Sequence, residues 1–359
     1  MRRALVILMA LVLAGGVTYA LFPEGDDDKD VVEVSGLIGS EKRDFFQDPQ
    51  VVAELAKQGL KVNVESVGSW LMDGETKRDF AFPASQPPAD KLRDAWGIKE
   101  VPVQPFYSPL VILAHRPVAD VLRQNNLATL DESTGLWTFR MDAYVAALKA
   151  GSTWPDLTGA KDHAELKGPV FLTTTDPETS SSGALHIALL SYLLNNRQVV
   201  FDQTGIDNTK KVLYTATALQ GGQQSSSDEP FKRFLAGVGN PLVLAYESQA
   251  AALVLKGEPT GDMVVLYPDT TIYTDHTIVS RTDNGRKLAA QLRDNPELRR
   301  LEARYGFRPQ DDPDAFAALV KGKTPAFAPN LTAAKVNQPP IPVPDVLTRL
   351  IKAAKGKAQ

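Results

Sequence analysis

The stretch that decides the fold is residues 31–66, VVEVSGLIGSEKRDFFQDPQVVAELAKQGLKVNVES. Val31 to Ser35 is rich in β-branched residues and predicts a strand, and Lys61 to Ser66 alternates apolar and polar residues in the manner of a second strand. Between them, a two-glycine loop leads into a helix over Asp48 to Gln58, which has Pro49 in its first turn. A crossover of this length predicts parallel strands in a right-handed β–loop–α–β unit.

The same alternation of strand and helix continues along the chain. Further strands are predicted at Asp79–Ala84, Pro109–Ala114, Val170–Thr174, Pro241–Tyr246, Met263–Tyr267 and Thr277–Ser280. Helices are predicted at Ala89–Trp96, Val118–Asn125, Asp142–Ala150, Ala184–Leu194, Gly285–Arg293 and Asn295–Arg304. This order predicts α/β sheets flanked by helices. Ligands of such sheets bind beyond the carboxyl ends of the strands.

The composition excludes several classes of function. The 359 residues carry a formal net charge of -4, which gives no electrostatic signal for a nucleic-acid partner. The chain has no cysteine, so it forms neither disulfides nor thiolate zinc sites and has no site for lipid attachment to cysteine. Its four histidines, His115, His163, His186 and His276, show no metal-binding spacing. We therefore predict no catalytic residues, no cofactor and no metal.

The N-terminus predicts export. Arg2 and Arg3 precede an uncharged apolar run from Ala4 to Phe22, and an acidic spacer occupies residues 23–30. The run, 19 residues long, is about long enough to span a bilayer, and the arginines orient its start toward the cytoplasm. It is either an uncleaved signal anchor or a signal peptide with Thr18 and Ala20 before the cut. Both versions place the body at the outer face of the cytoplasmic membrane, anchored or secreted.

Hydroxyl-bearing side chains follow successive strands and are the candidate ligand contacts. The loop from Thr175 to Gly183 follows a predicted buried strand and leads into an apolar helix, whose free N–H groups favour an anionic guest. The candidate ligand-binding residues are Ser40, Ser69, Ser85, Thr175, Ser181, Ser182 and Tyr246. Lys42 could add charge to the ligand site, although a lone exposed lysine is more often solvated. Gly221-Gly222 before Ser225-Ser226-Ser227 is typical of a flexible loop.

On these residues the chain resembles bacterial extracellular solute-binding proteins of the type II periplasmic fold, the superfamily with molybdate- and phosphate-type members. The resemblance rests on the loops around Gly39-Ser40-Glu41-Lys42, Val64-Glu65-Ser66-Val67-Gly68-Ser69, Phe82-Pro83-Ala84-Ser85, Thr174-Thr175-Asp176-Pro177, Ala245-Tyr246-Glu247-Ser248 and Tyr305-Gly306-Phe307-Arg308-Pro309. It implies two lobes and a ligand cleft between them, with lobe 1 over 31–113 and 275–323 and lobe 2 over 114–274. Residues 324–359 would then form a Pro-rich strap and a basic tail, which is an amphipathic helix or a frayed end.

The resemblance implies capture of a small ligand, with an oxyanion as one candidate, for an ABC-type transporter and its permease. The chain departs from the usual importer component because it lacks a lipid-modified cysteine and has a long tail. The alternative is a membrane-tethered sensory or protein-interaction module that keeps the fold and answers to a partner such as a von Willebrand A-like protein. A hydrolase is a third reading, disfavoured because no nucleophile or base motif is present.

Overall fold

A computed structural model of the chain describes residues 31–75 and 77–357. The predicted signal peptide or anchor at 1–22 and the spacer at 23–30 lie outside the described residues. Within the described part, none of the helices has the length and apolar character needed to cross a membrane.

The described strands form one mixed sheet in the order β2-β1-β3-β9-β4-β8-β6-β5, with β7 and β10 both paired to β4. The strands are β1 (Val32–Ile38), β2 (Leu60–Ser66), β3 (Phe80–Phe82), β4 (Val103–His115), β5 (Ala128–Asp131), β6 (Leu136–Phe139), β7 (Val243–Tyr246), β8 (Met263–Pro268), β9 (Tyr273–Ser280) and β10 (Arg308–Pro309). β1 and β2 are parallel and paired along their whole lengths, which confirms the predicted opening unit.

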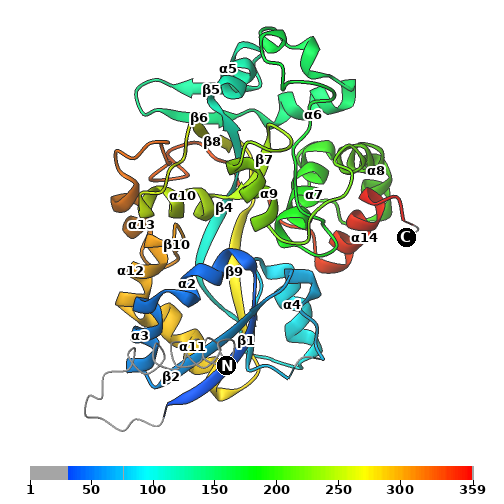
Figure 1. The fold of residues 1–359 in the computed structure, drawn as a ribbon. Helices are drawn as coiled ribbons and strands as arrows, with labels where there is room; N and C mark the ends of the chain where they lie inside the picture. The colour runs from blue at the N-terminus through cyan, green and yellow to red at the C-terminus, as the bar shows by residue number, and fades with distance from the viewer. Residues whose placement is uncertain (1–30, 76, 358–359) are drawn as a thin grey trace, which may run out of the picture. The chain divides into compact units, whose positions relative to one another are not determined.

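Helices flank the strands on both sides (Figure 1). They are α2 (Arg43–Gln47), α3 (Pro49–Lys57), α4 (Gln86–Ala95), α5 (Arg116–Gln124), α6 (Met141–Ala150), α7 (Ser181–Leu194), α8 (Gln203–Ala218), α9 (Asp228–Leu235), α10 (Glu247–Lys256), α11 (Asp283–Asp294), α12 (Pro296–Arg304), α13 (Pro313–Val320) and α14 (Pro344–Ala354). Short 3₁₀ turns lie at η1 (Ser40–Lys42), η2 (Ser69–Leu71), η3 (Trp154–Asp156) and η4 (Ala160–Asp162).

Two long strands, β4 and β9, join two groups of elements, which we name lobe 1 and lobe 2 (Figure 1). The first half of β4 pairs with β9 and the second half pairs with β7 and β8. Phe106 of β4 lies in the core of lobe 1 with β1, β3, α11 and α12. Leu110 and Ile112 of the same strand lie in the core of lobe 2 with α5 to α8. One strand therefore contributes to the cores of both lobes.

The predicted strand at Val170–Thr174 is wrong. Only Thr173 pairs with β7, through Thr173 N–H to Leu242 O at 2.9 Å and Leu244 N–H to Thr173 O at 2.9 Å. The ladder stops there because the N–H of Thr174 donates to the side chain of Gln220 at 2.7 Å instead of to a strand. A side-chain acceptor from the turn after α8, far along the chain, cannot be read from the local β-branched pattern.

The proline-rich segment and the helix after it are parts of lobe 2. Phe327 and Leu331 of the strap are buried against β7, β8 and α10. Leu347 and Leu350 of α14 are fully buried in the core that also holds α7 and α8. Of the two predicted alternatives for the tail, the structure has the helix.

Candidate functional site

A pocket of ≈280 Å³ lies between lobe 1 and lobe 2. From lobe 1 it is lined by Gly39 to Glu41, Arg43 and the segment Ser66 to Ser69 with Leu71. From lobe 2 it is lined by Ser180, the run Ser225 to Ser227, and Tyr246. Its wall is therefore mostly hydroxyl groups and backbone, drawn from segments far apart in the chain.

The local fold brings these loops to one edge. β1 and β2 run parallel, so their carboxyl ends at Ile38 and Ser66 lie side by side. Each strand continues into a 3₁₀ turn, which begins at Ser40 after β1 and at Ser69 after β2. On the opposite wall, three helices of lobe 2 begin at the pocket, because the residues that cap α7, α9 and α10 are Ser180, Ser227 and Tyr246. Helix N-termini carry partial positive charge, so the pocket has a positive bias from the backbone.

The two lobes touch around the pocket. The hydroxyls of Ser85 in lobe 1 and Ser181 in lobe 2 lie 2.7 Å apart, and Ser226 donates to Ser40 across the same interface at 2.9 Å. The N–H of Trp70 donates to the backbone oxygen of Thr179 at 3.1 Å. We call this arrangement, in which the two lobes are in direct contact, the closed arrangement.

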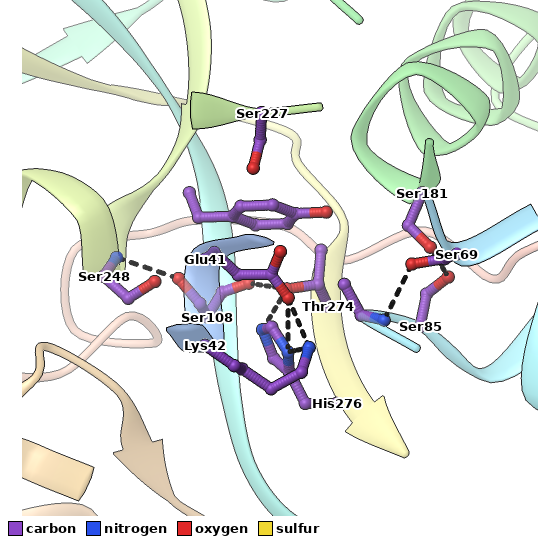
Figure 2. Close-up of polar contacts among 12 residues, drawn as sticks. Glu41, Lys42, Ser69, Ser85, Ser108, Ser181, Ser227, Ser248, Thr274 and His276 are labelled. Atoms are coloured by element: carbon purple, nitrogen blue, oxygen red, sulfur yellow. Dashed lines mark hydrogen bonds and ion pairs between the residues drawn. The ribbon is translucent and has the colours of Figure 1, made fainter. Parts of the chain in front are cut away.

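The structure distributes the seven candidate residues over three positions. Ser40, Ser69 and Tyr246 line the pocket. Ser85 and Ser181 instead bond each other at the contact between the lobes (Figure 2). Thr175 and Ser182 are buried behind the wall, 2.8 Å apart, and Thr175 accepts from the N–H of Gly183 at 2.9 Å. These last two order the start of α7 and are not among the residues that line the pocket.

Sequence reasoning missed the charged centre of the site. Glu41 lines the pocket, with only 4% of its side chain exposed. Lys42, expected to be solvated, is fully buried and ion-paired to Glu41. The signal that could have revealed them is an acidic and a basic residue, adjacent in a tight turn at the end of a buried strand. The predicted loop at Ser225 to Ser227 also forms part of the pocket wall, a role that the sequence did not predict.

Behind Glu41, a buried histidine completes a charged cluster (Figure 2). Lys42 Nζ lies 3.0 Å from His276 Nδ1, which in turn lies 3.5 Å from Glu41 Oε1. Burial holds the pKa of His276 well below its usual value, and the positive charge of Lys42 adds to the effect. Burial also lowers the pKa of Lys42, while Glu41 opposes that shift. We therefore assign a neutral imidazole beside a Lys–Glu ion pair.

Two further ionisable groups, Tyr246 and Arg43, line the pocket, and a third, Asp228, follows the pocket residue Ser227 in the chain. Burial raises the pKa of Tyr246 well above its usual value, Glu41 adds to this, and hydrogen bonds with Ser182 oppose it, so Tyr246 is a neutral phenol. Arg43 lines the rim of the pocket, where its Nε donates to the hydroxyl of Ser66 at 3.2 Å. Burial, followed by the charge of Glu41, raises the pKa of Asp228 in the first turn of α9.

The arrangement can offer hydrogen bonds and a compensated charge to a small polar ligand. Serine hydroxyls both donate and accept, while Glu41 can only accept when ionised. Over residues 31–75 and 77–357, His, Asp and Glu form no cluster of three that could hold a metal ion. His276 faces Lys42 and Thr274 and makes no hydrogen bond to a serine of the pocket in the described structure. The site thus has the form of a binding pocket.

Comparison with solved structures identifies proteins of the same fold. A periplasmic thiamin-binding protein matches 93% of this chain and 98% of its own, with a TM-score of 0.57 at 10% identity. The sulfate-binding protein SubI from Mycobacterium tuberculosis H37Rv matches 91% and 96%, with a TM-score of 0.55 at 16% identity. A putative spermidine/putrescine ABC transporter protein from Listeria monocytogenes matches 90% and 98%, with a TM-score of 0.55 at 14% identity.

No protein-family model and no curated protein matches the sequence. The chain has the mixed α/β fold of these two-lobed binding proteins, which confirms the predicted fold class at that level. The similar proteins bind different ligands, and at these identities the likeness extends to the fold alone. The molybdate- and phosphate-type subgroup therefore stays a prediction.

Proposed function

We propose that this protein is an extracytoplasmic solute-binding protein that captures a small ligand and delivers it to an ABC-type transporter. The observation that carries the proposal is the pocket between the lobes, lined from both sides by Ser40, Ser69, Ser180, Ser227 and Tyr246. A ligand that contacts both walls would stabilise the closed arrangement by its differential affinity for that state. The similar binding proteins support this reading through their shared fold.

A small oxyanion is the ligand class that the electrostatics favour. Three helix N-termini point positive backbone charge at the pocket, and Arg43 adds a side-chain cation at its rim. The one carboxylate in the wall, Glu41, is compensated by Lys42 directly behind it. Hydroxyl groups then supply the donors for the ligand oxygens.

We further propose that the ligand is bound without chemical change. A serine nucleophile needs a base within hydrogen-bond reach. The hydroxyl of Ser40 bonds only other serines, Ser226 and Ser227, in the described structure. His276 is held behind Glu41 and accepts from Lys42, so it is turned away from the serines of the pocket.

The test is thermal unfolding of the protein with millimolar phosphate, sulfate, molybdate, sugars, amino acids, polyamines and thiamin. A ligand present at about 100 times its dissociation constant stabilises the folded state by roughly 2.7 kcal/mol, which raises Tm by several degrees. We expect a shift with oxyanions and none with the other classes. A shift with another class would overturn the oxyanion assignment, and no shift with any class would favour the partner-binding alternative.

A further inference from the structure

Lys42 differs from an ordinary surface lysine in its burial and in its charged partners. Its ammonium group is fully buried, although burying a charge is unfavourable unless the charge is paired and hydrogen-bonded. It contacts both the Glu41 carboxylate and His276 Nδ1, which also lie 3.5 Å from each other, and it lies 4.8 Å from the ring centre of Phe82. The cluster therefore joins a residue of the pocket wall to β9, one of the two strands that connect the lobes.

The chemistry of the groups fixes the direction of each hydrogen bond. We take Lys42, the partner of the Glu41 carboxylate, as an ammonium, which only donates; in that state His276 Nδ1 accepts and the imidazole proton lies on Nε2. Nε2 then donates to Thr274 Oγ1, 3.4 Å away, and Thr274 Oγ1 donates to the backbone oxygen of Ser108 at 2.6 Å. Ser108 belongs to β4, and its hydroxyl accepts from the N–H of Ser248 in α10 at 3.0 Å. Figure 2 shows this chain of contacts from Glu41 to Ser248.

We infer that Lys42 is a positioning residue, which holds the Glu41 carboxylate in the pocket wall and links it through His276 to both strands that join the lobes. The inference rests on the proposed solute-binding function and adds the residue through which occupancy of the pocket reaches the connecting strands. Of the residues in this series of contacts, from Glu41 to Ser248, only Glu41 lines the pocket. A ligand that displaces Glu41 therefore acts on its partner Lys42 and on His276, whose Nδ1 lies 3.0 Å from Lys42 Nζ and 3.5 Å from Glu41 Oε1.

The aromatic residues around His276 keep this connection rigid. The imidazole ring lies 5.2 Å from the ring centres of Phe106 and Phe307 and 6.4 Å from that of Phe82. Tyr246, which lines the pocket from lobe 2, lies 5.7 Å from it. Rings packed on several sides leave His276 no room to rotate its nitrogens away from Lys42.

The first experiment needs no ligand. Nitrogen-15 NMR of histidine-labelled protein, assigned with His276→Asn, reports which ring nitrogen carries the proton. We expect neutral His276 with its proton on Nε2, and a changed Nδ1 shift in Lys42→Met. A proton on Nδ1, or an unchanged Nδ1 shift in Lys42→Met, overturns the inference. Because no ligand is used, this result is independent of whether the solute-binding proposal holds.

The second experiment measures binding and closure. Fluorescent labels on cysteines placed at exposed Lys91 and Lys211, one in each lobe, report the distance between lobes, since the chain has no other cysteine. The titrant is the panel compound that shifts Tm. Loss of the positioning group in Lys42→Met should weaken binding by about tenfold or more and reduce closure. The matched control is Lys57→Met, which removes a lysine that pairs with Glu54 at the surface of the same lobe.

A third variant separates positioning from folding. Glu41→Gln with Lys42→Met removes both charges, so it avoids the uncompensated buried carboxylate that the single variant leaves. We expect this double variant to fold, with little change in Tm, and to lose ligand-induced closure. Wild-type affinity and closure in Lys42→Met would refute the inference. If the wild-type protein binds no compound of the panel, the solute-binding proposal fails, and the histidine experiment alone decides on Lys42.

Discussion

Gly68 lies where the two lobes meet, and adding one methyl group there should disfavour the closed arrangement. Gly68 precedes η2 with φ -61° and ψ 140°, a conformation that alanine adopts without strain. In the closed structure, however, a Cβ at this position would overlap the backbone oxygen of Thr179. It would also lie 3.1 Å from the carbonyl carbon of Thr179 and 3.3 Å from the backbone oxygen of Ser225. All three atoms belong to the backbone of lobe 2, so no side chain can rotate away.

The free-energy cost of Gly68→Ala in the closed arrangement comes from the backbone contact between Gly68 and Thr179, which must separate. The two backbones have to separate by roughly 1 Å before the new methyl group is at normal van der Waals distance. That movement lengthens the hydrogen bond from Trp70 N–H to Thr179 O, which is 3.1 Å in the closed structure. Overpacking of this kind costs about 1–3 kcal/mol. Because the cost falls on the closed state alone, Gly68→Ala should weaken ligand affinity by roughly 5- to 150-fold.

Calorimetric titration and the label-to-label distance between lobes measure this effect. Gly222→Ala is the matched control, because a Cβ there meets no atom within 4 Å. Opening of the lobes relieves the clash, so the free energy of unfolding without ligand should change by less than about 0.5 kcal/mol in both variants. Unchanged affinity in Gly68→Ala, or an equal loss in Gly222→Ala, would refute the reasoning.

Three further predictions concern stability. Arg308→Met leaves the buried carboxylate of Glu247 without its cation. It should lower the free energy of unfolding, measured by urea titration, by about 3–5 kcal/mol, and a loss of less than about 1 kcal/mol would contradict this prediction. Glu302 is fully buried with no partner for either carboxyl oxygen in the described structure, and burial raises its pKa well above the ordinary 4.5. The protein should therefore lose stability relative to Glu302→Gln as pH rises above 4.5, and parallel stability–pH curves would disprove this. Leu350→Ala should cost about 2–5 kcal/mol by urea titration, because its side chain is fully buried, and a cost near zero would mean that α14 is detached.

Local patterns predicted the elements whose hydrogen bonds are local or regular. The unit of β1, α3 and β2 was read from β-branched alternation and from Pro49 at a helix start, and the structure agrees closely. The pattern at Val170–Thr174 looked the same but failed, because Gln220 takes the N–H that a strand would need. Residues 128–139 were not predicted as a hairpin, since β5 and β6 are short and only the pairing of β6 with β8 joins them to the sheet.

The candidate site was predicted in outline and missed at its centre. Hydroxyl residues after successive strands predicted the edge where Ser40 and Ser69 lie, since topology alone places strand ends together, and contact of these residues with a ligand stays a prediction. Whether a serine faces a ligand or a neighbouring serine depends on contacts between lobes, as for Ser85 and Ser181. Lys42 was misjudged because its burial depends on His276, which lies far along the chain.

The route of the chain through lobe 2 sets the order in which the protein can fold. The core of lobe 2 begins with Leu110 on β4 and is completed by Leu347 and Leu350 of α14, after the chain has already built β9, α11 and α12 in lobe 1. Contacts so distant in sequence form late, because the entropy of closing a long loop must be overcome before they contribute. While the polypeptide emerges from the ribosome, α7 and α8 must therefore wait with apolar surface uncovered until residues near 350 appear.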